Sequence, residues 1–316
     1  MNSAIVITVD KAKKILIVIC GPTAVGKTSV AIDLAKELQT DIYSADSRQL
    51  YRELTIGTAK PSEEELDEVK HHFINAISIE DPYSAGRFEL ECIESLDFIF
   101  QEKDVAILVG GTGLYIDAVL VGLDQFPDIS KETKEYINNI YLKEGLLGLQ
   151  KLLKQKDPSY YEFVDLENSR RLTRALEVIV ESDKPYSNFL NQEKPKRSFN
   201  PILIHLNMER ELLYERINIR VDQMMTQGLL DEVENLKPKR HLKALQTVGY
   251  SELFKYLDGE YTLNFAISEI KKNTRRYAKR QNTWFKKYKC NPFSSKDLES
   301  ILAYIDNQMD KCNNPK

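Results

Sequence analysis

The chain of 316 residues contains no long hydrophobic run. Its apolar blocks, of which Ile15–Cys20 is among the longest, fall far short of the roughly 18 residues that a membrane-spanning helix needs. The first twenty residues lack a small-residue cleavage site, and charges interrupt their apolar stretches at Asp10, Lys11, Lys13 and Lys14. We therefore expect neither a membrane protein nor a secreted one.

Cysteines and zinc-binding patterns are equally scarce. The cysteines are too widely spaced for a metal knuckle and too few for a disulfide scaffold, being only Cys20, Cys92, Cys290 and Cys312. No CxxC…HxxxH module follows the last basic stretch, so we expect no zinc-finger extension. His71 and His72 are adjacent and point in different directions, which favours structural packing over metal binding. A reduced, cytoplasmic protein is expected.

Charge is unevenly distributed along the chain. The formal net charge is −4, yet the segment 271–289 holds nine lysines and arginines and no acidic residue. Outside this segment the remaining 35 basic residues face 48 acidic ones. Such a segment indicates either a local contact with a polyanion or an exposed helix with solvated charges.

Hydrophobic patterning predicts an α/β fold. Short apolar segments with the pattern of strands lie at 15–20, 41–43, 105–109 and 202–206. Helical spacing follows three of them, in segments that begin near Ser29, Leu114 and Arg210. Strands that alternate with helices are typical of a parallel sheet with right-handed crossovers.

The composition and the hydrophobic pattern of the sequence change after Gly122. Residues 123–199 are rich in Lys, Glu, Tyr and Leu, show helical spacing and contain no strand-like block. We therefore expect a discontinuous α/β core of residues 13–122 and 200–290, which ends in the basic helical region. A helical insertion domain of residues 123–199 interrupts this core, and residues 291–316 are expected to form a polar tail.

Residues 21–28 match the phosphate-binding pattern GxxxxGK[ST], between the first predicted strand and the first predicted helix. Glycines let successive backbone N–H groups curl round an anion, and a helix N-terminus adds partial positive charge. Lys27 can bring a mobile charge to the phosphate oxygens, and the Thr28 hydroxyl can ligate Mg²⁺. A phosphate is thus expected to contact Gly21, Pro22, Thr23, Ala24, Val25, Gly26, Lys27 and Thr28.

The sequence departs from ordinary nucleotide hydrolases after the strand 105–109. Those enzymes usually carry an acidic residue there to hold Mg²⁺. This chain instead reads Gly-Gly-Thr-Gly at 110–113. The carboxylate candidate is Asp46, just after the strand 41–43, although a turn or helix-cap role would explain Asp46 equally well.

Eight sequence blocks, taken in order, resemble one family, the bacterial tRNA dimethylallyltransferases (isopentenyl-pyrophosphate:tRNA transferases). The blocks are 21–35, 46–61, 71–88, 109–123, 168–178, 220–233, 247–253 and 274–287. The chain departs from the family at 163–168, where Ile-His-Pro-Asn is frequent, and at 75–77, where Asp is common. These departures concern the insertion and local packing.

The resemblance implies a fold and a reaction. The fold is a P-loop core related to nucleotide kinases, with a helical insertion. The reaction transfers the dimethylallyl group of dimethylallyl diphosphate to N6 of the adenosine just 3′ of a tRNA anticodon and releases diphosphate. tRNA, dimethylallyl diphosphate and Mg²⁺ are the expected partners of a monomeric enzyme.

The resemblance also assigns roles to residues. Asp46 is the expected general base, partly because it would follow a strand on the same rim as the P-loop. Lys27 and Thr28, with Mg²⁺, would stabilise the departing diphosphate. Arg220 is the candidate for a further cation there, with Arg216 one turn earlier as the alternative.

A flipped base and its flanking phosphates need polar and basic contacts. From the core, the expected tRNA contacts are Asp46, Ser47, Arg48, Gln49, Thr112 and Gly249. From the insertion and the basic stretch they are Lys134, Arg170, Arg171, Arg174, Lys279, Arg280, Gln281 and Trp284. A solvated lysine at position 134 and a plain turn threonine at position 112 stay open as alternatives.

Three other functions compete with this prediction. A small-molecule kinase would hold ATP in the P-loop, but it explains neither the basic stretch nor Asp46. An adenylate dimethylallyltransferase would use free AMP or ATP, whereas the long insertion and two basic clusters favour a polynucleotide. An RNA-binding GTP or ATP switch would carry out no prenyl transfer.

Overall fold

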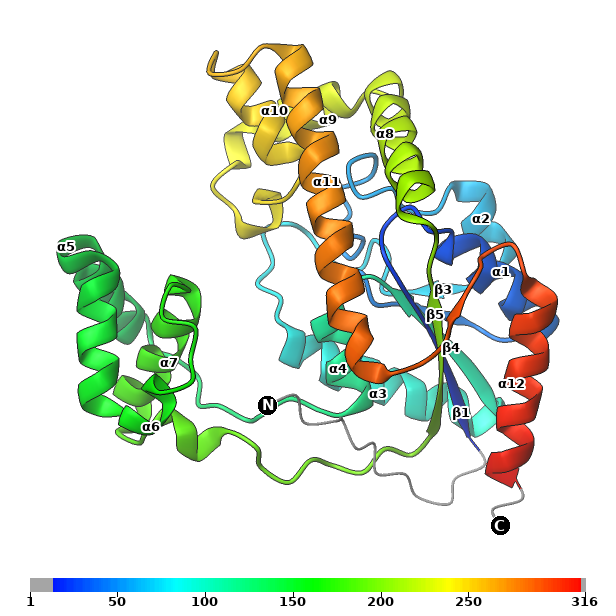
Figure 1. The fold of residues 1–316 in the computed structure, drawn as a ribbon, viewed down its shortest axis with the longest axis horizontal. Coiled ribbons are helices and arrows are strands. Elements are labelled where there is room, and N and C mark those ends of the chain that lie inside the picture. The colour runs from blue at the N-terminus through cyan, green and yellow to red at the C-terminus, as the bar shows by residue number, and fades with distance from the viewer. Residues whose placement is uncertain (1–13, 314–316) are drawn as a thin grey trace. The chain divides into compact units, whose positions relative to one another are not determined.

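A six-stranded parallel sheet forms the centre of the computed structural model, which describes residues 14–313 (Figure 1). The strands are β1 (Ile15–Cys20), β2 (Ile42–Ser44), β3 (His71–His72), β4 (Val105–Gly110), β5 (Asn200–Leu206) and β6 (Pro292–Phe293). Their order in the sheet is β3-β2-β4-β1-β5-β6. Because all pairs are parallel, the loops that follow β1, β2 and β4 meet at one edge of the sheet.

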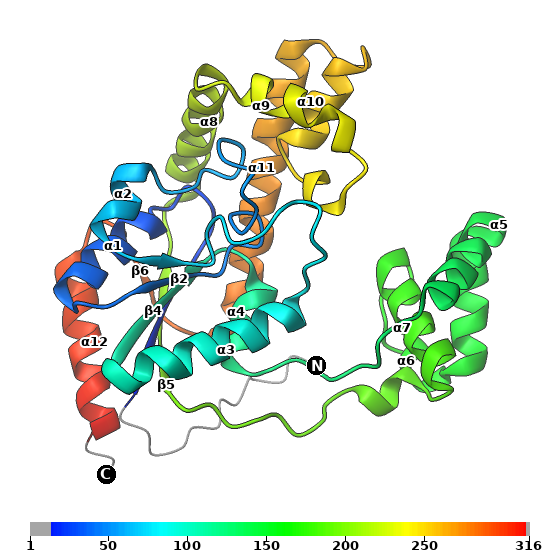
Figure 2. The same cartoon turned by 180° about the vertical axis from the view of Figure 1, so that it is seen from behind.

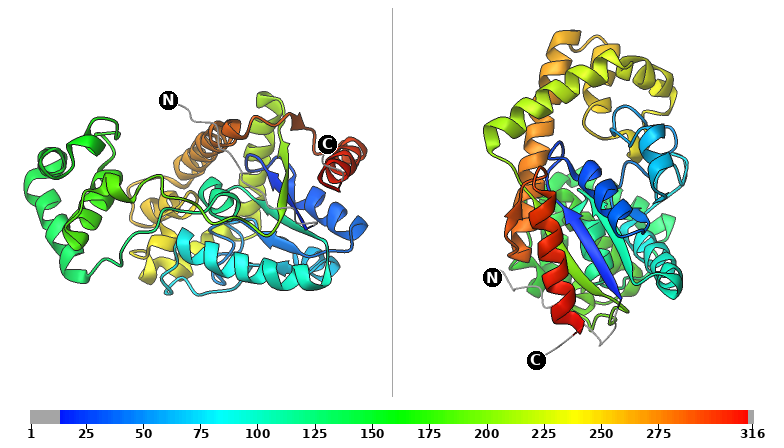
Figure 3. Two further views of the ribbon diagram at one scale, coloured as in Figure 1. Left: turned by 90° about the horizontal axis from the view of Figure 1, so that it is seen from below. Right: turned by 90° about the vertical axis from the view of Figure 1, so that its right-hand side faces the viewer.

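The central strand β1 is buried on both faces, as its unbroken apolar sequence predicts. Leu16 and Val18 pack into one hydrophobic core, and Ile17 and Ile19 pack into the other. Each core is formed between one face of the sheet and the layer of helices that covers it. α1 (Lys27–Glu37) and α12 (Leu298–Asn313) cover one face, whereas α3 (Ala85–Glu102) and α4 (Gly113–Leu120) cover the other (Figures 2 and 3).

A group of helices lies beyond the carboxyl edge of the sheet (Figure 1). It consists of α8 (Arg210–Thr226), α9 (Leu229–Leu236), α10 (Tyr250–Leu257) and the long α11 (Leu263–Phe285). α11 packs against both α8 and α10. The loops that follow β1, β2 and β4 therefore face these helices. The short α2 (Glu63–Glu68) lies next to α1 (Figure 1).

Residues Leu123–Pro195 form a compact unit of their own. Its helices are α5 (Lys131–Lys156), which is broken at Gly145, α6 (Pro158–Tyr161) and α7 (Ser169–Ser182). The core of this unit contains Ile137, Leu149, Leu153, Leu172, Leu176 and Ile179. The unit ends before the expected boundary at 199, because Arg197 already binds Glu89 of α3 at 2.7 Å.

The expectation of a polar tail after residue 290 is wrong. Pro292–Phe293 forms β6, which pairs with His205 and Leu206 of β5. α12 then buries Ile301 and Ile305 against the sheet. Apolar residues at helical spacing alternate in α12 with acidic and amide residues, so an amphipathic helix reads as polar where its buried face is not considered.

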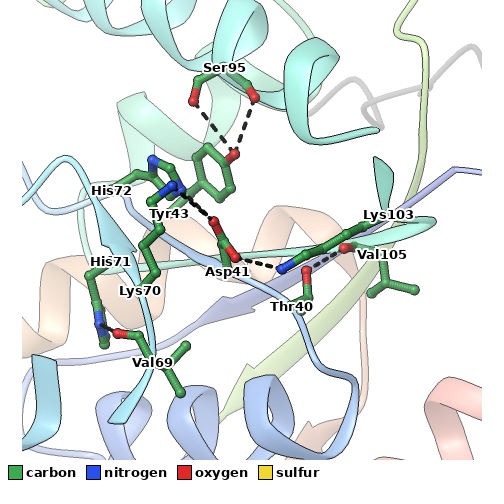
Figure 4. A network of polar contacts seen from close by, with 10 residues as sticks. All are labelled: Thr40, Asp41, Tyr43, Val69, Lys70, His71, His72, Ser95, Lys103 and Val105. Atoms are coloured by element: carbon green, nitrogen blue, oxygen red, sulfur yellow. Dashed lines mark hydrogen bonds and ion pairs between the residues drawn. The ribbon is translucent and has the colours of Figure 1, made fainter. Parts of the chain in front are cut away.

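A buried ionic network lies beside the outermost strand β3 and its neighbour β2 (Figure 4). Asp41 accepts hydrogen bonds from Lys103 Nζ and from the His72 ring, both at 2.8 Å. The His72 ring stacks on Tyr43 at a centroid distance of 4.4 Å. His72 therefore has a structural role. Among residues 14–313, no group of three or more His, Cys, Asp or Glu side chains could hold a metal ion, and no helix is long and apolar enough to cross a membrane.

Candidate active site

The turn between β1 and α1 is curled like a phosphate-binding loop. Backbone φ is positive at Gly21 (152°), Ala24 (66°) and Gly26 (104°). A β-carbon on Gly21 would lie 2.4 Å from the Leu206 carbonyl oxygen, so glycine is required there. α1 begins directly at Lys27, and the first N–H groups of a helix have no intrahelical partners. The turn therefore offers backbone donors to an anion.

Lys27 lies folded against this loop. Its Nζ donates hydrogen bonds to the carbonyl oxygens of Gly21 (3.0 Å) and Pro22 (2.9 Å). Burial lowers the pKa of Lys27 to about 8; the Asp46 carboxylate opposes this shift and the Arg220 cation adds to it. An incoming phosphate would stabilise the charged form of Lys27.

Asp46 lies just after β2, at the same edge of the sheet. Its Oδ1 accepts the Arg48 N–H at 2.9 Å, and its Oδ2 has no hydrogen-bond partner in the described part of the chain. The Ser47 N–H donates to Thr112 Oγ1 at 3.0 Å, which ties the turn after β2 to the turn after β4. The backbone thus holds Asp46 in place and leaves one carboxylate oxygen available.

Side chains from two helices contact Thr23 of the P-loop. From α8, Arg220 Nη1 donates to Thr23 Oγ1 at 3.3 Å. From α11, Gln281 Oε1 accepts the Thr23 N–H at 2.8 Å, and Gln281 Nε2 donates to the Gly111 carbonyl at 2.9 Å. Burial lowers the pKa of Arg220 while Asp46 opposes this shift, and a guanidinium stays charged at any physiological pH.

Two cavities open onto these residues. The phosphate cavity, of about 450 Å³, is lined by the P-loop residues Thr23, Ala24, Gly26, Lys27 and Thr28. The apolar cavity, of about 330 Å³, is lined by Ile217, Val221, Met224, Leu229, Val248 and Ile270. Both cavities are also lined by Thr23, Asp46, Thr58, Arg220 and Tyr277. The expected base and the expected cation therefore lie where the two cavities meet.

The glycine-rich turn after β4 allows close packing. A β-carbon on Gly110 would lie 2.3 Å from the Ala45 carbonyl oxygen, and one on Gly113 would lie 2.3 Å from the Trp284 ring. Trp284 is thus packed on this turn, with 39% of its surface exposed, and Lys287 lies over its ring. Where nucleotide hydrolases carry a metal-binding acid, this turn has small residues, which let other segments of the same chain pack closely against it.

Two of the core residues that are predicted to contact tRNA, Arg48 and Gln49, form hydrogen bonds within the chain. Arg48 Nη1 donates to the carbonyl oxygens of Ala244 (3.0 Å) and Lys243 (3.3 Å). Gln49 Nε2 donates to the carbonyls of Thr58 and Ala59, and Gln49 Oε1 accepts from Ser44 Oγ. Gly249 is buried at the start of α10 and lines the apolar cavity. Val25 of the P-loop has its side chain buried in the hydrophobic core.

The basic stretch on α11 divides into two groups of cations. Some lysines of the stretch 271–289 form ion pairs, including Lys271 with Asp222 of α8 and Lys287, just after α11, with Asp117 of α4. Lys279 and Arg280 are exposed and form no ion pair in the described structure. The polyanion prediction thus rests on only part of the stretch.

The remaining predicted tRNA contacts lie in the separate helical unit. Lys134 is exposed on α5, and Arg170, Arg171 and Arg174 are exposed on α7. The Arg174 guanidinium lies over the Phe126 ring at 5.3 Å. Within this unit, the four residues present positive charge to solvent.

Sequence reasoning missed several residues of the site. Thr58 lines both cavities, and the block 46–61 that contains it is the signal that could have identified it. Ile217, Val221 and Met224 follow helical spacing, which predicts a buried face but cannot distinguish a core from a cavity wall.

Comparison with known proteins decides the family. A family model described as IPP transferase matches residues 49–288. The tRNA dimethylallyltransferase of Flavobacterium johnsoniae is 50% identical over 300 residues, which cover 92% of this chain and 97% of that protein. The one from Christiangramia forsetii is 52% identical over 272 residues, which cover 86% and 90%. This chain belongs to the IPP transferase family.

Solved structures agree with this assignment. The full-length tRNA isopentenylpyrophosphate transferase of Bacillus halodurans matches with a TM-score of 0.71 at 35% identity, over 95% of this chain and 98% of that one. The predicted parallel α/β P-loop fold is therefore confirmed, as is the prediction of an enzyme of the tRNA dimethylallyltransferase class. None of the three competing functions is supported by these relatives.

Proposed function

We propose that this enzyme prenylates N6 of the adenosine on the 3′ side of a tRNA anticodon, with dimethylallyl diphosphate as donor. The bond between the allylic carbon and the diphosphate oxygen breaks, a bond from that carbon to N6 forms, and N6 loses a proton. The observation that carries the proposal is the junction of the two cavities, which Asp46 and Arg220 both line. A base and a cation would thus lie beside one reacting carbon.

The phosphate cavity suits the diphosphate leaving group. Backbone N–H groups of the P-loop, Lys27 and Arg220 would stabilise the negative charge that grows on the departing oxygen. Arg220 already contacts the P-loop through Thr23, so the cation is positioned before the substrate binds. Arg216 also lines this cavity and can add charge at its rim.

Mg²⁺ fits this cavity as a companion of the diphosphate. The Thr28 hydroxyl lines it, and Mg²⁺ usually binds one or two protein groups together with substrate phosphates and water. Bound there, the ion would neutralise phosphate charge. Among the described residues no group of three or more His, Cys, Asp or Glu side chains could hold a metal ion, so the diphosphate and water would supply the other ligands.

Asp46 is suited to take the N6 proton. The lone pair of an exocyclic adenine amine is delocalised into the ring, so alkylation requires help from a base. Oδ2 of Asp46 is unpartnered in the described structure, while Oδ1 is anchored by the Arg48 N–H. Proton transfer to a positioned carboxylate typically contributes about 10²- to 10⁴-fold to a rate.

The apolar cavity would hold the dimethylallyl group and exclude water from the reacting carbon. Its aliphatic lining comes from α8, α9 and α11 and from Val248 before α10, and Tyr277 also lines it. Burial, followed by the nearby Asp46 charge, raises the pKa of Tyr277 to about 12, so this phenol stays neutral. Water exclusion matters because an allylic carbon that loses diphosphate also reacts with water.

The exposed cations offer contacts for the RNA. Lys279 and Arg280 on α11, and Arg170 and Arg171 on α7, would bind phosphates of the anticodon arm. Ser47, Thr112 and Gly249 line the apolar cavity and would contact the flipped adenosine. Arg48, Gln49 and Gln281 would act chiefly by holding this site in shape. A monomeric state and a cytoplasmic location stay predictions.

One assay tests the proposal. The protein is incubated with radiolabelled dimethylallyl diphosphate and with tRNA, AMP or ATP as acceptor. We expect label in tRNA alone, and nuclease digestion followed by chromatography should place it on the adenosine 3′ of the anticodon. Label in AMP or ATP, or on another tRNA nucleoside, would overturn the proposal.

A further inference from the structure

The Glu232 carboxylate on α9 holds one loop of the α/β core. Its Oε2 accepts the backbone N–H groups of Thr55 (3.0 Å) and Ile56 (2.8 Å), and its Oε1 accepts that of Gly57 (3.1 Å). The Tyr250 hydroxyl of α10 donates to the same Oε1 at 2.5 Å. Four donors from two parts of the fold therefore converge on one side chain.

Gly57 and Tyr250 are pressed together beneath this carboxylate. A β-carbon on Gly57 would lie 2.6 Å from the Tyr250 ring, so no larger residue fits there without displacing the ring. Tyr250 is fully buried, and its burial together with the Glu232 charge raises the pKa of its hydroxyl. The hydroxyl therefore remains a donor to Glu232 at all physiological pH values.

The loop that Glu232 holds forms part of the reaction site. Gly57 and Thr58 line the apolar cavity, and Thr58 and Ala59 line the phosphate cavity. α9 contributes Leu229 to the apolar cavity, and Gly249, the residue before Tyr250, lines it too. Glu232 thus joins two walls of one cavity that belong to different parts of the fold.

We propose that Glu232 is a positioning residue for prenyl transfer, which fixes residues 55–59 against α9 and α10 so that Thr58 stays at the junction of the two cavities. The inference rests on the proposed function and adds a residue to it. The bonding requires a carboxylate, because four donors need two acceptor oxygens. A glutamine would turn one of these oxygens into a donor that faces other donors.

The test compares Glu232→Gln with the wild type in steady-state prenylation of tRNA. Because misplacement of a site wall by about 1 Å can cost roughly 100-fold, we expect kcat/KM for dimethylallyl diphosphate to fall about 10- to 100-fold. The Kd for an anticodon stem–loop should not change, since Lys279 and Arg280 lie on α11. Amide hydrogen exchange at residues 55–57 should become faster, which is a readout independent of activity.

Two further variants keep the inference falsifiable. Glu234→Gln removes an exposed carboxylate from the same helix and should behave as wild type. Tyr250→Phe keeps the ring against Gly57 but deletes one of the four donors, so its loss of activity should be smaller than that of Glu232→Gln. Thermal unfolding of each variant, followed by circular dichroism, identifies any that fails to fold.

The outcomes separate this inference from the proposed function. If the wild type prenylates tRNA and Glu232→Gln does so at the same rate, Glu232 has no positioning role. If Glu232→Gln exchanges its 55–57 amides as slowly as the wild type, the carboxylate does not hold the loop. If the wild type itself transfers no prenyl group to tRNA, the proposed function fails, and the exchange result still reports on the contact.

Discussion

Gln281 Oε1 accepts the backbone N–H of Thr23 at 2.8 Å, so a side chain near the end of α11 completes the P-loop. The same amide group donates to the Gly111 carbonyl, and the whole side chain is buried. Both contacts join segments that are far apart in sequence. Gln281 is thus the link between the phosphate loop, the glycine turn and the basic helix.

Gln281→Ala should therefore weaken donor binding and stability together. It leaves the partly buried Thr23 N–H and the buried Gly111 carbonyl without their Gln281 partner, and an unsatisfied buried group typically costs about 1–3 kcal/mol of the free energy of unfolding. We also expect KM for dimethylallyl diphosphate to rise, because the Thr23 backbone loses its anchor. Urea unfolding and steady-state kinetics measure the two effects. Gln101→Ala, at an exposed position of α3, is the control and should change neither.

Asp46→Asn should separate chemistry from binding. The amide can still accept the Arg48 N–H but cannot take a proton, so we expect turnover to fall about 10²- to 10⁴-fold. The Kd values for the donor and for the anticodon stem–loop should stay close to those of the wild type. Asp33→Asn, on the exposed side of α1, serves as the matched control. Unchanged turnover in Asp46→Asn would remove this residue from the role of base.

The pH dependence of donor binding should report on Lys27. Its pKa of about 8 means that the side chain is charged at pH 7 and largely neutral at pH 9. Above about pH 8 the affinity for dimethylallyl diphosphate should therefore decline, by up to tenfold per pH unit. Lys27→Arg remains charged, so its affinity, although lower, should stay flat between pH 7 and pH 9.5. An equally steep decline in this variant would assign the titration to another group.

Local sequence patterns predicted the parts of this molecule that depend on neighbouring residues. The unbroken apolar run of β1 and the motif at 21–28 each determine their own conformation, and both were placed correctly. The position of Asp46 beside the P-loop followed from a simple rule, since parallel strands end at one edge of the sheet.

Contacts between distant segments could not be predicted in this way. No periodicity reveals that Gln281 completes the P-loop or that Glu232 holds residues 55–57, because each contact depends on how helices pack after folding. β6 was missed for a similar reason. It has two residues and is a strand only because β5 lies beside it.

The ionic network of Asp41 allows a last prediction, on stability (Figure 4). Burial raises the pKa of Asp41, but the hydrogen bonds from Lys103 and His72 outweigh burial and hold the pKa below its ordinary value. This carboxylate therefore stabilises the fold above its ordinary pKa, near pH 4, and the stabilisation is lost as the pH falls through the lower pKa of the folded state. Asp41→Asn should lower the free energy of unfolding at pH 7 by about 1–3 kcal/mol, because Lys103 loses its charged partner.

Urea unfolding at pH 7 and pH 3 measures this effect, and the difference between wild type and Asp41→Asn should shrink at the lower pH. Asp104→Asn is the matched control, because the Lys14–Asp104 pair has the same kind of geometry at 2.7 Å but Asp104 is 77% exposed. Solvent screens such a pair, so its loss should scarcely alter stability. Equal effects of the two substitutions would show that burial does not strengthen the Asp41 network.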